Sequence, residues 1–415
     1  MSGRIAYLLK KFPRLSETFV LGEILGQEEL GRDVVVYSRR TPDDEPRHPE
    51  LDRLRAEIVE VPAASSVEPF SLLVDLANDD PELVRRLGDA VARLSRCGVA
   101  RITKLAAEAL WLRADVLARG IDHVHVHFAT ESAIVANVLR ALGGPGYSIT
   151  AHAKDIYRET VDPKLLELLV GESEFTVTVC DANVEHLRSM LPDTAMERVR
   201  RLYNGIDRAT FQGVERRPRA RRVLSIGRLV EKKGFDTLLD AFAILARRGV
   251  QFDAEIVGEG EERARLERRA REAGLASSVR FLGALPADRV REQLGLATIF
   301  ALPCRIGADG NRDALPTVLL EAQAARVPIV SCPVSGVSEI LDEGRAGVLV
   351  PEADPVSLAD AIARMLDRSD ELHDLVEHGA QLGAREFDRG VQARVLGEWF
   401  DAAVLVGRET CASRT

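Results

Sequence analysis

The sequence predicts an α/β protein built from two doubly wound domains that face each other across a cleft. Short apolar, β-branched runs alternate with helical patterns along the chain, and a polar, basic connector at Ile206–Arg222 interrupts the alternation once. A chain of 415 residues is also too long for a single hydrophobic core. Alternation of this kind gives parallel sheets flanked by helices, with ligands expected beyond the carboxyl ends of the strands.

The predicted strands are apolar runs bounded by turn residues. In the first domain they are Ile5–Leu9, Val34–Tyr37, Ile58–Val61, Val124–Phe128, Ser148–His152 and Thr176–Cys180. In the second domain they are Val223–Ile226, Ala254–Val257, Val279–Leu282, Ile299–Leu302, Pro328–Ser331 and Val348–Val350. Helical patterns between them include Phe19–Leu30, Ala129–Leu142, Phe235–Ala246, Glu261–Ala273 and Val318–Ala325. We therefore expect domains at 1–206 and 207–388, a helical insertion at about 66–119, and a terminal segment at 389–415.

Composition narrows the functional class. With 46% hydrophobic and 29% charged residues, the chain is typical of soluble globular proteins, and no apolar run approaches the ~20 residues that span a bilayer. Its five cysteines show no paired spacing, which indicates a reducing cytoplasm. A net charge of −9 argues against a nucleic-acid partner, because such proteins normally carry a basic face.

One loop and the helix after it contain residues that are suited to binding a phosphorylated sugar. Pro316 stands where a helix begins, because its fixed φ suits the first turn and its missing N–H is not needed there. The amides around Leu315, Thr317 and Val318 then face outward at the positive end of the helix dipole, a seat for phosphate. Two carboxylates flank this seat and suit hydroxyl groups, which predicts a sugar nucleotide. The alternative is an acidic loop followed by an amphipathic helix.

Those carboxylates, Asp313 and Glu321, are separated by seven residues. This stretch resembles the E-x7-E signature of retaining glycosyltransferases of the GT-B fold, family 4. The family carries Glu-Gly-(Phe/Ile/Leu)-Pro before the helix, whereas this chain has Asp313-Ala314-Leu315-Pro316. Asp shortens the acidic arm by one methylene, and Ala lacks the freedom of Gly to adopt positive φ. The resemblance implies that Asp313 contacts donor-sugar hydroxyls and that Glu321 contacts the ribose.

Two basic side chains suit the donor diphosphate. Arg228 follows a strand that ends in Gly227, and Lys233 lies directly before a helix. The guanidinium N–H groups of an Arg and the ammonium group of a Lys beside a helix N-terminus neutralise the charge of a bound diphosphate. They also stabilise the diphosphate when it departs as the leaving group. In the family, the residues matching Arg228 and Lys233 hold the diphosphate. The alternative is a solvated basic turn, which suits Lys232.

A glycine-rich turn at Gly258-Glu259-Gly260 imitates part of a dinucleotide fingerprint. Arg263 stands in place of the third glycine, and no ribose-binding acid follows at the next strand, so the turn is a weak match for NAD. In the family, this turn and the loop that contains Leu285 line the nucleobase pocket. The resemblance therefore assigns Gly258, Glu259 and Leu285 to donor binding.

Three segments of the first half also resemble the family. His152, at the end of a strand, matches a histidine whose imidazole lies beside the donor sugar; the alternative is a structural hydrogen-bonding role. Asn204-Gly205 matches the segment that closes the first domain, and the resemblance assigns Asn204 to donor binding; Asn-Gly is equally a generic turn. Ser16 and Glu17 belong to a Phe-Pro-x-x-Ser-Glu-Thr-Phe loop that is similar to the subgroup building bacterial exopolysaccharides such as colanic acid. This loop is assigned to the acceptor side, although Ser16 also suits a helix N-cap.

The candidate metal ligands are His123, His125 and His127, which alternation places on one face of a strand. Zinc uses such rows, but no Asp or Cys partner with ligand spacing lies nearby, so a strand end running into the cleft is favoured. No Asp-x-Asp follows an apolar strand to hold a metal–diphosphate. We therefore expect transfer without a metal or a cofactor.

The helical stretch from Arg85 to Arg119 is basic within an acidic protein and has Leu and Trp interleaved. It suits a peripheral contact with an anionic membrane or a phosphorylated lipid acceptor. The alternative is a solvated helix face packed on its own domain. The expected location is the cytoplasm, either free or peripheral on the inner face of the membrane.

Together, these motifs imply a retaining glycosyltransferase. It would move a sugar from a UDP- or GDP-linked donor to a hydroxyl of a saccharide or polyprenyl-linked acceptor, in exopolysaccharide or cell-surface glycan synthesis. As in relatives, the last helix, Val391–Val406, would cross back to the first domain. A GT-B sugar-nucleotide epimerase or phosphorylase stays open as an alternative, and an NAD-dependent oxidoreductase is a distant one.

Overall fold

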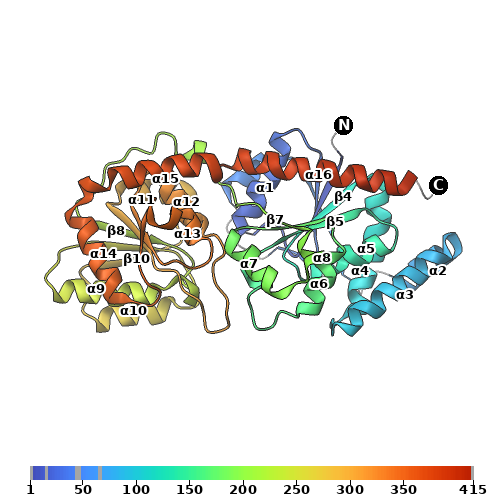
Figure 1. The fold of residues 1–415 in the computed structure, drawn as a ribbon, viewed down its shortest axis with the longest axis horizontal. Helices are drawn as coiled ribbons and strands as arrows, with labels where there is room; N and C mark the ends of the chain where they lie inside the picture. The colour runs from blue at the N-terminus through green and yellow to red at the C-terminus, as the bar shows by residue number, and fades with distance from the viewer. Residues whose placement is uncertain (1–2, 15–16, 43–47, 64–67, 413–415) are drawn as a thin grey trace. The chain divides into compact units, whose positions relative to one another are not determined.

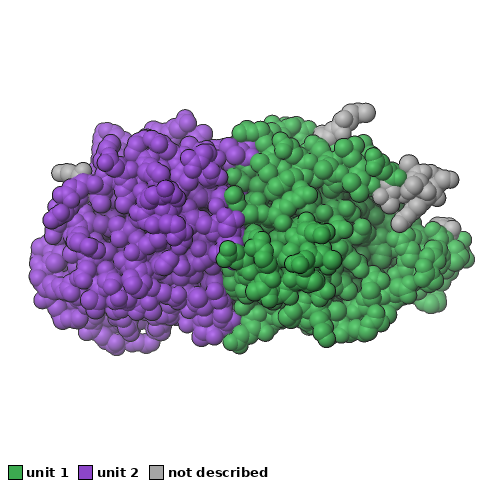
Figure 2. Space-filling view, viewed as in Figure 1, with its two compact units in different colours: residues 1–179, 183–202, 392–415 green, residues 180–182, 203–391 purple. Residues whose placement is uncertain are grey.

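The computed structural model describes residues 3–14, 17–42, 48–63 and 68–412. The chain divides into two compact units (Figure 2). Unit 1 comprises residues 1–179, 183–202 and 392–415, and unit 2 comprises residues 180–182 and 203–391. The main division therefore falls at 202/203, where the sequence suggested 206/207, and most of the terminal segment belongs to unit 1.

Unit 1 contains a 7-stranded sheet in the order β3-β2-β1-β4-β5-β6-β7, with all neighbouring strands parallel (Figure 1). The strands are β1 (Ile5–Leu9), β2 (Val34–Ser38), β3 (Glu57–Glu60), β4 (His123–His127), β5 (Gly146–Ala151), β6 (Phe175–Thr178) and β7 (Val199–Arg201). The sequence predicted the first six. It missed β7, because this edge strand of the sheet carries one apolar side chain followed by two arginines.

Helices cover both faces of this sheet, because the side chains of each strand alternate between two hydrophobic clusters. On β1, Ile5 and Tyr7 pack with α1 (Thr18–Glu29) and α16 (Arg389–Ala412), whereas Ala6 and Leu8 pack into the cluster on the other face. That second cluster includes residues of α2 (Pro69–Asp79), α3 (Pro81–Arg96), α4 (Ile102–Ala118), α5 (Glu131–Ala141) and α6 (Pro163–Gly171). The short helices α7 (Asp181–Met190) and α8 (Asp193–Met196) follow β6.

Unit 2 contains a 6-stranded parallel sheet in the order β10-β9-β8-β11-β12-β13 (Figure 1). Its strands are β8 (Arg222–Ile226), β9 (Asp253–Val257), β10 (Val279–Gly283), β11 (Ile299–Leu302), β12 (Ile329–Ser331) and β13 (Val348–Leu349). Its helices are α9 (Phe235–Arg247), α10 (Arg263–Glu272), α11 (Ala287–Leu296), α12 (Thr317–Ala324), α13 (Val337–Ile340), α14 (Pro355–Asp367) and α15 (His373–Glu386).

Both sheets reverse their strand order at one point, which confirms the prediction of two doubly wound domains. In unit 1 the reversal lies between β1 and β4, and in unit 2 it lies between β8 and β11. In open parallel sheets, ligands bind beyond the carboxyl ends of the strands at this reversal. The loops after these four strands are therefore the first places to look for a site.

Within the part of the chain that is described, no helix combines the length and the apolar character that crossing a bilayer requires.

Candidate active site

Two loops of unit 2 carry most of the predicted site residues, and both begin at the reversal of its sheet. The loop after β8 contains Arg228 and the short 3-10 helix Glu231–Lys233, and the loop after β11 leads through Asp313 into α12. They are neighbours because β8 and β11 are paired in parallel, so their carboxyl ends lie at the same edge. The topology thus brings together residues that are about 80 positions apart in the sequence.

Two glycines permit the loop after β8 to lie close to the loops after β11 and β9. Gly234 has φ +67°, and a Cβ atom there would lie 1.9 Å from the carbonyl oxygen of Pro303, which follows β11. Gly258 has φ +140°, and a Cβ atom there would lie 2.0 Å from the carbonyl oxygen of Gly227. Any other residue at either position would push the loops apart, so both glycines are required by the local backbone.

Asp313 lies between two lysines. Its carboxylate Oδ1 is 2.9 Å from Lys232 Nζ, and its Oδ2 is 2.6 Å from Lys233 Nζ. The side chains are mostly buried, with 20% of Lys232 and 13% of Lys233 and Asp313 exposed. The sequence treated Lys232 as part of a solvated turn, but the structure places it in this cluster. Its pairing was not predictable from the turn itself, because the partner comes from the β11 loop.

The charges of this cluster support one another. Burial alone would raise the pKa of Asp313, but Lys233 and Lys232 outweigh it and hold that pKa well below its usual range. Burial likewise opposes the charged form of Lys233, but Asp313 outweighs it and raises the pKa of Lys233, although Arg228 acts in the opposite direction. Nearby, burial reinforced by Asp313 raises the pKa of the Cys304 thiol to about 12. The cluster therefore holds an ionised Asp313 carboxylate beside a protonated Lys233, and its thiol stays protonated.

Arg228 is exposed at the edge of the unit 2 sheet where the carboxyl ends of β8 and β11 lie. It forms no ion pair with any residue that the structure describes, although its charge acts on Lys233. Lys232, Lys233 and Arg228 together carry three positive charges against the single carboxylate of Asp313. The edge therefore has unbalanced positive charge available for an anion.

Helix α12 presents the second predicted carboxylate. Its first turn begins after Pro316, and Leu315 and Val318 are buried beside it, while Thr317 is partly exposed. Glu321 lies on the helix and is partly buried. The loop before the helix is fixed by a hydrogen bond from the Gly336 N–H to the Ala314 carbonyl oxygen at 2.8 Å. Ala314 thus occupies the position of the family glycine with its φ in the ordinary negative range.

The residues predicted to contact the nucleobase of the donor lie at the carboxyl ends of β9 and β10. The Gly258 N–H donates to the Gly283 carbonyl oxygen at 2.8 Å, which joins these two strand ends. Glu259 is exposed and forms an ion pair with Arg263, and Leu285 is partly buried. The Arg263 side chain thus occupies the region that a third fingerprint glycine would leave open.

His152 belongs to unit 1, at the carboxyl end of β5, and its side chain is buried. Its ring packs against both Phe19 and Phe128, with ring centroids 4.7 and 4.6 Å away. Phe128 follows β4 and has φ +70°, an unfavourable conformation for a bulky residue. The reversal of the unit 1 sheet thus carries a strained loop that packs on the predicted histidine.

Three further predictions concern loops. Ser16 lies outside the described residues; Glu17 occupies the N-cap position of α1 without a side-chain cap and pairs with Arg14 at 2.8 Å. Asn204 is partly exposed at the start of unit 2. Its neighbour Gly205 is required by the fold, because a Cβ atom there would lie 2.5 Å from the Cα atom of Arg389.

The histidine row on β4 has a partner that the sequence analysis missed. Glu23 of α1 comes close enough to His125 and His127 for these three side chains to form a candidate metal site. Glu23 Oε1 lies 3.3 Å from His125 Nε2 and 3.2 Å from His127 Nε2. The signal in the sequence was a carboxylate on an otherwise apolar helix face, four residues after Phe19.

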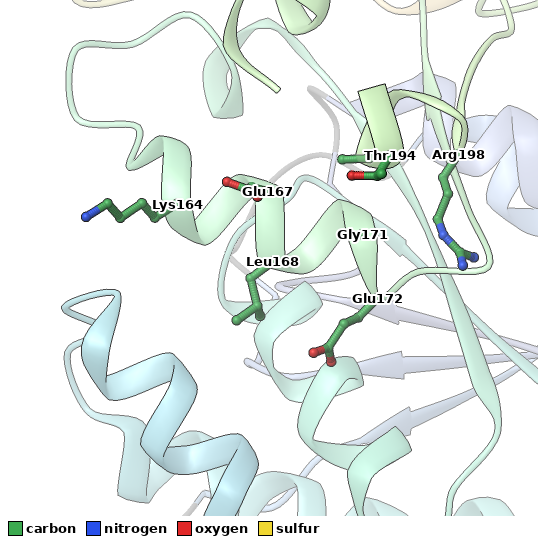
Figure 3. Close-up of a pocket in the computed structure, with 8 residues that line it drawn as sticks. Lys164, Glu167, Leu168, Gly171, Glu172, Thr194 and Arg198 are labelled. Atoms are coloured by element: carbon green, nitrogen blue, oxygen red, sulfur yellow. The ribbon is translucent and has the colours of Figure 1, made fainter. Parts of the chain in front are cut away.

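Unit 1 also has a surface hollow of about 540 Å³ between α6 and α8 (Figure 3). It contains none of the predicted site residues. Its lining is Lys164, Glu167, Leu168, Gly171, Glu172, Thr194, Ala195 and Arg198. We therefore place the candidate site at the sheet reversals and not in this hollow.

Several arginines of the basic helical stretch have partners within unit 1. Arg85 pairs with Asp89 at 2.7 Å, Arg93 with Glu172 at 3.2 Å, and Arg119 with Asp115 at 2.7 Å. Arg113 Nε donates to the Leu142 carbonyl oxygen at 2.8 Å. The contacts of Arg93 and Arg113 join this stretch to other elements of unit 1, whereas Arg85 is exposed and pairs within its own helix.

The chain is similar to proteins named as glycosyltransferases. Residues 207–382 match the family described as Glycosyl transferases group 1. The amylovoran biosynthesis glycosyltransferase AmsK of Erwinia amylovora is 27% identical over 95% of this chain and 98% of its own length. The putative colanic acid biosynthesis glycosyltransferase WcaL of Escherichia coli (strain K12) is 26% identical over 96% of this chain and 100% of its own length.

Solved structures share the fold. Sucrose-phosphate synthase from Thermosynechococcus elongatus matches with a TM-score of 0.73 at 17% identity, over 99% of this chain and 100% of its own. HepE of Anabaena, in complex with UDP-glucose, matches with a TM-score of 0.70 at 15% identity, over 96% of this chain and 99% of its own. This likeness confirms the predicted GT-B fold class with two Rossmann-like domains.

Proposed function

We propose that this chain, whose residues 207–382 match the family described as Glycosyl transferases group 1, is a glycosyltransferase that transfers a sugar from a nucleotide donor with retention of anomeric configuration. The proposed donor is UDP- or GDP-linked. The proposed acceptor is a hydroxyl of a saccharide or a lipid-linked saccharide, in exopolysaccharide or cell-surface glycan synthesis. Two full-length relatives named for such pathways support this assignment.

The observation that carries the proposal is the pairing of Asp313 with Lys232 and Lys233 at the reversal of the unit 2 sheet. A donor diphosphate that reaches this edge competes with the carboxylate for two ammonium groups. Arg228 adds a fork of N–H donors, and the N-terminus of α12 adds unpaired amides. The Asp313 carboxylate that is released from the lysines can then accept hydrogen bonds from donor-sugar hydroxyls.

The reaction itself needs no protein nucleophile. The bond from the anomeric carbon to the leaving phosphate oxygen breaks on the same face of the sugar on which the bond to the acceptor oxygen forms. The acceptor hydroxyl gives its proton to that phosphate oxygen. Lys233, Lys232 and Arg228 stabilise the charge that develops on the departing diphosphate. Because these side chains supply the positive charge, we propose that transfer does not depend on a divalent metal, so a chelator should leave the rate unchanged.

The remaining roles follow the resemblance. We propose that Glu321 binds the ribose, that Gly258, Glu259 and Leu285 contact the base, and that His152 acts on the donor sugar. We propose that the loop containing Ser16 and Glu17 serves the acceptor. Peripheral binding to an anionic membrane would bring the enzyme to a lipid-linked acceptor, and vesicle sedimentation with and without anionic lipid tests it.

A thermal-shift panel of UDP-, GDP- and ADP-sugars and their free diphosphates tests the donor assignment, because a ligand of the folded state raises its melting temperature. We expect one nucleoside diphosphate and its sugar to raise the melting temperature of the wild type. If none does so at millimolar concentration, the donor assignment is wrong. Incubation with the donor alone separates the alternatives: an epimerised sugar identifies an epimerase, and phosphate-dependent release of a sugar 1-phosphate identifies a phosphorylase.

A further inference from the structure

The row of three histidines on β4 belongs to a continuous hydrogen-bond network that the proposed reaction does not use. His123, His125 and His127 are almost fully buried, and Glu23 lies beside them with 16% of its side chain exposed. Burial lowers the pKa of His123 to about 3, and it also lowers the pKa of His125. These two rings are therefore neutral, so each has one N–H donor and one nitrogen acceptor.

At the His123 end of the network, the donor and the acceptor of each hydrogen bond can be assigned. His123 Nδ1 is buried without a partner among the described residues, and its Nε2 lies 2.7 Å from Ser148 Oγ. A bare lone pair at Nδ1 costs less than a buried N–H without an acceptor, so the proton belongs on Nε2 and is donated to Ser148. The Ser148 hydroxyl then donates to His125 Nδ1 at 2.7 Å. His125 is left with its proton on Nε2, directed at Glu23 and Thr150.

The His152 end has the same direction. The backbone N–H of Asp155 donates to the His152 imidazole in a capping box, and His152 Nε2 lies 3.1 Å from His127 Nδ1. Because Nε2 of His152 faces His127, Nδ1 is the ring nitrogen left to accept from the cap, which puts the proton on Nε2, where it is donated to His127. His127 then has its proton on Nε2, 3.2 Å from Glu23 Oε1. Both branches therefore converge on the Glu23 carboxylate as donors.

The Glu23 carboxylate is a suitable acceptor for the two series of hydrogen bonds that reach it. The Tyr7 hydroxyl adds a third hydrogen bond to its Oε1 at 3.0 Å. Burial alone would raise the pKa of Glu23, but His127 and His125 outweigh it and hold that pKa well below its usual range. An ionised carboxylate accepts hydrogen bonds and donates none, which fixes the proton positions along both branches.

We propose that Glu23 and His127 are positioning residues for His152 and hold it as the neutral Nε2–H tautomer with its ring and its loop fixed. We call Glu23, His127 and His152 the histidine chain. Both ring nitrogens of His152 have protein partners in this arrangement, so His152 would serve the donor sugar through the backbone turn at Ala153–Asp155 that the imidazole caps, and not through a free ring nitrogen. The functional consequence rests on the proposed role of His152 in transfer, whereas the tautomers do not.

A metal at Glu23, His125 and His127 would require the opposite tautomers. A metal takes the Nε2 lone pair of His127, so the proton would move to Nδ1 and be donated to His152 Nε2. His152 would then carry its proton on Nδ1, where it would face the N–H of Asp155 that now donates to it. On the other branch the proton shift would leave His123 with a buried Nδ1–H that lacks an acceptor. Hydrogen bonds alone account for every close contact, so the geometry favours the network over a metal.

Nitrogen NMR of the histidine-labelled full chain tests the tautomers directly. Two-bond correlations distinguish a protonated ring nitrogen from a bare one, and single histidine variants assign the signals. We expect protonated Nε2 and bare Nδ1 on His127 and His152 at neutral pH. A bare Nε2 on His127, or a stoichiometric metal that survives dialysis against chelator, would overturn the proposal.

Matched variants of His127 test the functional consequence. Asn places a polar atom near the position of Nδ1, whereas Gln places one near Nε2. His127→Gln should lose the contact with His152 and lower kcat by about 10²-fold without changing nucleoside-diphosphate affinity. His127→Asn keeps an acceptor for His152 and should recover much of that loss. His123→Gln is the control, because it removes a buried imidazole from the same strand face outside the histidine chain and should change stability but not kcat.

The outcomes separate the two proposals. If His152→Ala impairs transfer but His127→Gln transfers at the wild-type rate per folded molecule, the positioning role is wrong. If both transfer normally, the assignment of His152 to the reaction is wrong, and the NMR result alone decides the histidine chain. If the wild type transfers no sugar from any donor, the proposed function fails independently of the tautomers.

Discussion

The two sheet reversals of this protein each hold a carboxylate among nitrogen groups, but they hold it differently. In unit 2, Asp313 contacts two lysine ammonium groups at 2.9 and 2.6 Å. In unit 1, Glu23 accepts from a tyrosine hydroxyl and from histidines that rigid strands and stacked rings keep in place. Lysine side chains are long and reorient easily, whereas a buried imidazole on a strand has one orientation.

This difference indicates what each reversal is built to do. A carboxylate balanced by flexible ammonium groups can give them up to a competing anion, because the charge is conserved when partners exchange. A carboxylate that ends two directed hydrogen-bond branches cannot be displaced without leaving buried donors unpaired. We therefore interpret the Asp313 cluster at the unit 2 reversal as an exchange site, where the lysines exchange their carboxylate partner for a ligand anion. We interpret the histidine chain at the unit 1 reversal as a support site that holds His152 in place. The following variants test this distinction, in order of expected effect.

The largest effect is expected for Asp313→Ala. Loss of the carboxylate removes the proposed contact with the donor sugar, so transfer should fall by about 10²–10³-fold, the range for removing one preorganised polar contact to a transition state. Affinity for the free nucleoside diphosphate should be unchanged or tighter, because the lysines no longer have an internal partner. Calorimetry with UDP and GDP and a transfer assay measure both quantities.

Two variants sharpen this result. Glu321→Ala should show the opposite pattern, with weaker binding of the free nucleoside diphosphate, because its proposed contact is with the ribose. Asp313→Glu restores the reach of the family residue and should retain transfer. Wild-type turnover in Asp313→Ala would assign this carboxylate a structural role and remove the exchange interpretation.

The next effect is expected for His152→Ala. A positioned group that acts in the reaction contributes at least about 10²-fold to turnover, so kcat should fall by that factor while nucleoside-diphosphate affinity stays normal. A purely structural histidine would instead lower the melting temperature and leave turnover per folded molecule intact. Measuring melting temperature and kcat on the same purified variant decides between the two roles.

The sequence could predict the elements and most of the candidate residues, but not the contacts among them. The strand and helix runs were readable because strands buried on both faces are continuously apolar. The environment of Lys232 was wrongly predicted because its partner, Asp313, belongs to another loop. The two loops are neighbours because β8 pairs with β11 and because Gly234 leaves room for the Pro303 carbonyl. Glu23 was missed for the same reason. The carboxylate of Glu23 in the middle of helix α1 was visible, but its histidine partners lie about a hundred residues away.

A smaller effect is expected for the diphosphate clamp. Arg228→Ala and Lys233→Ala should each weaken nucleoside-diphosphate binding by about 1.5–3 kcal/mol, the usual range for losing a charge-assisted hydrogen bond. Arg289→Ala is a matched control, because Arg289 lies exposed on α11 of the same unit and pairs with Glu292 at 2.7 Å. Unchanged affinity in both clamp variants, measured by calorimetry, would contradict the clamp.

The smallest effect concerns acid stability and compares the two carboxylates directly. Both have a pKa lowered in the folded state, so each contributes stability that is present above its unfolded pKa of about 4 and is lost as the pH falls toward its folded value. The melting temperature of the wild type should therefore fall on going from pH 7 to pH 3. That fall should be smaller by roughly 2–4 °C in Glu23→Gln and in Asp313→Asn, the shift that about 1 kcal/mol causes in a domain of this size. Raising the salt concentration should reduce the contribution of the Asp313 cluster more than that of the histidine chain, because the exchange site depends on charge pairs and the support site on directed hydrogen bonds. Equal salt sensitivity of the two variants would mean that both carboxylates are held by charge alone, and the distinction between the two reversals would be lost.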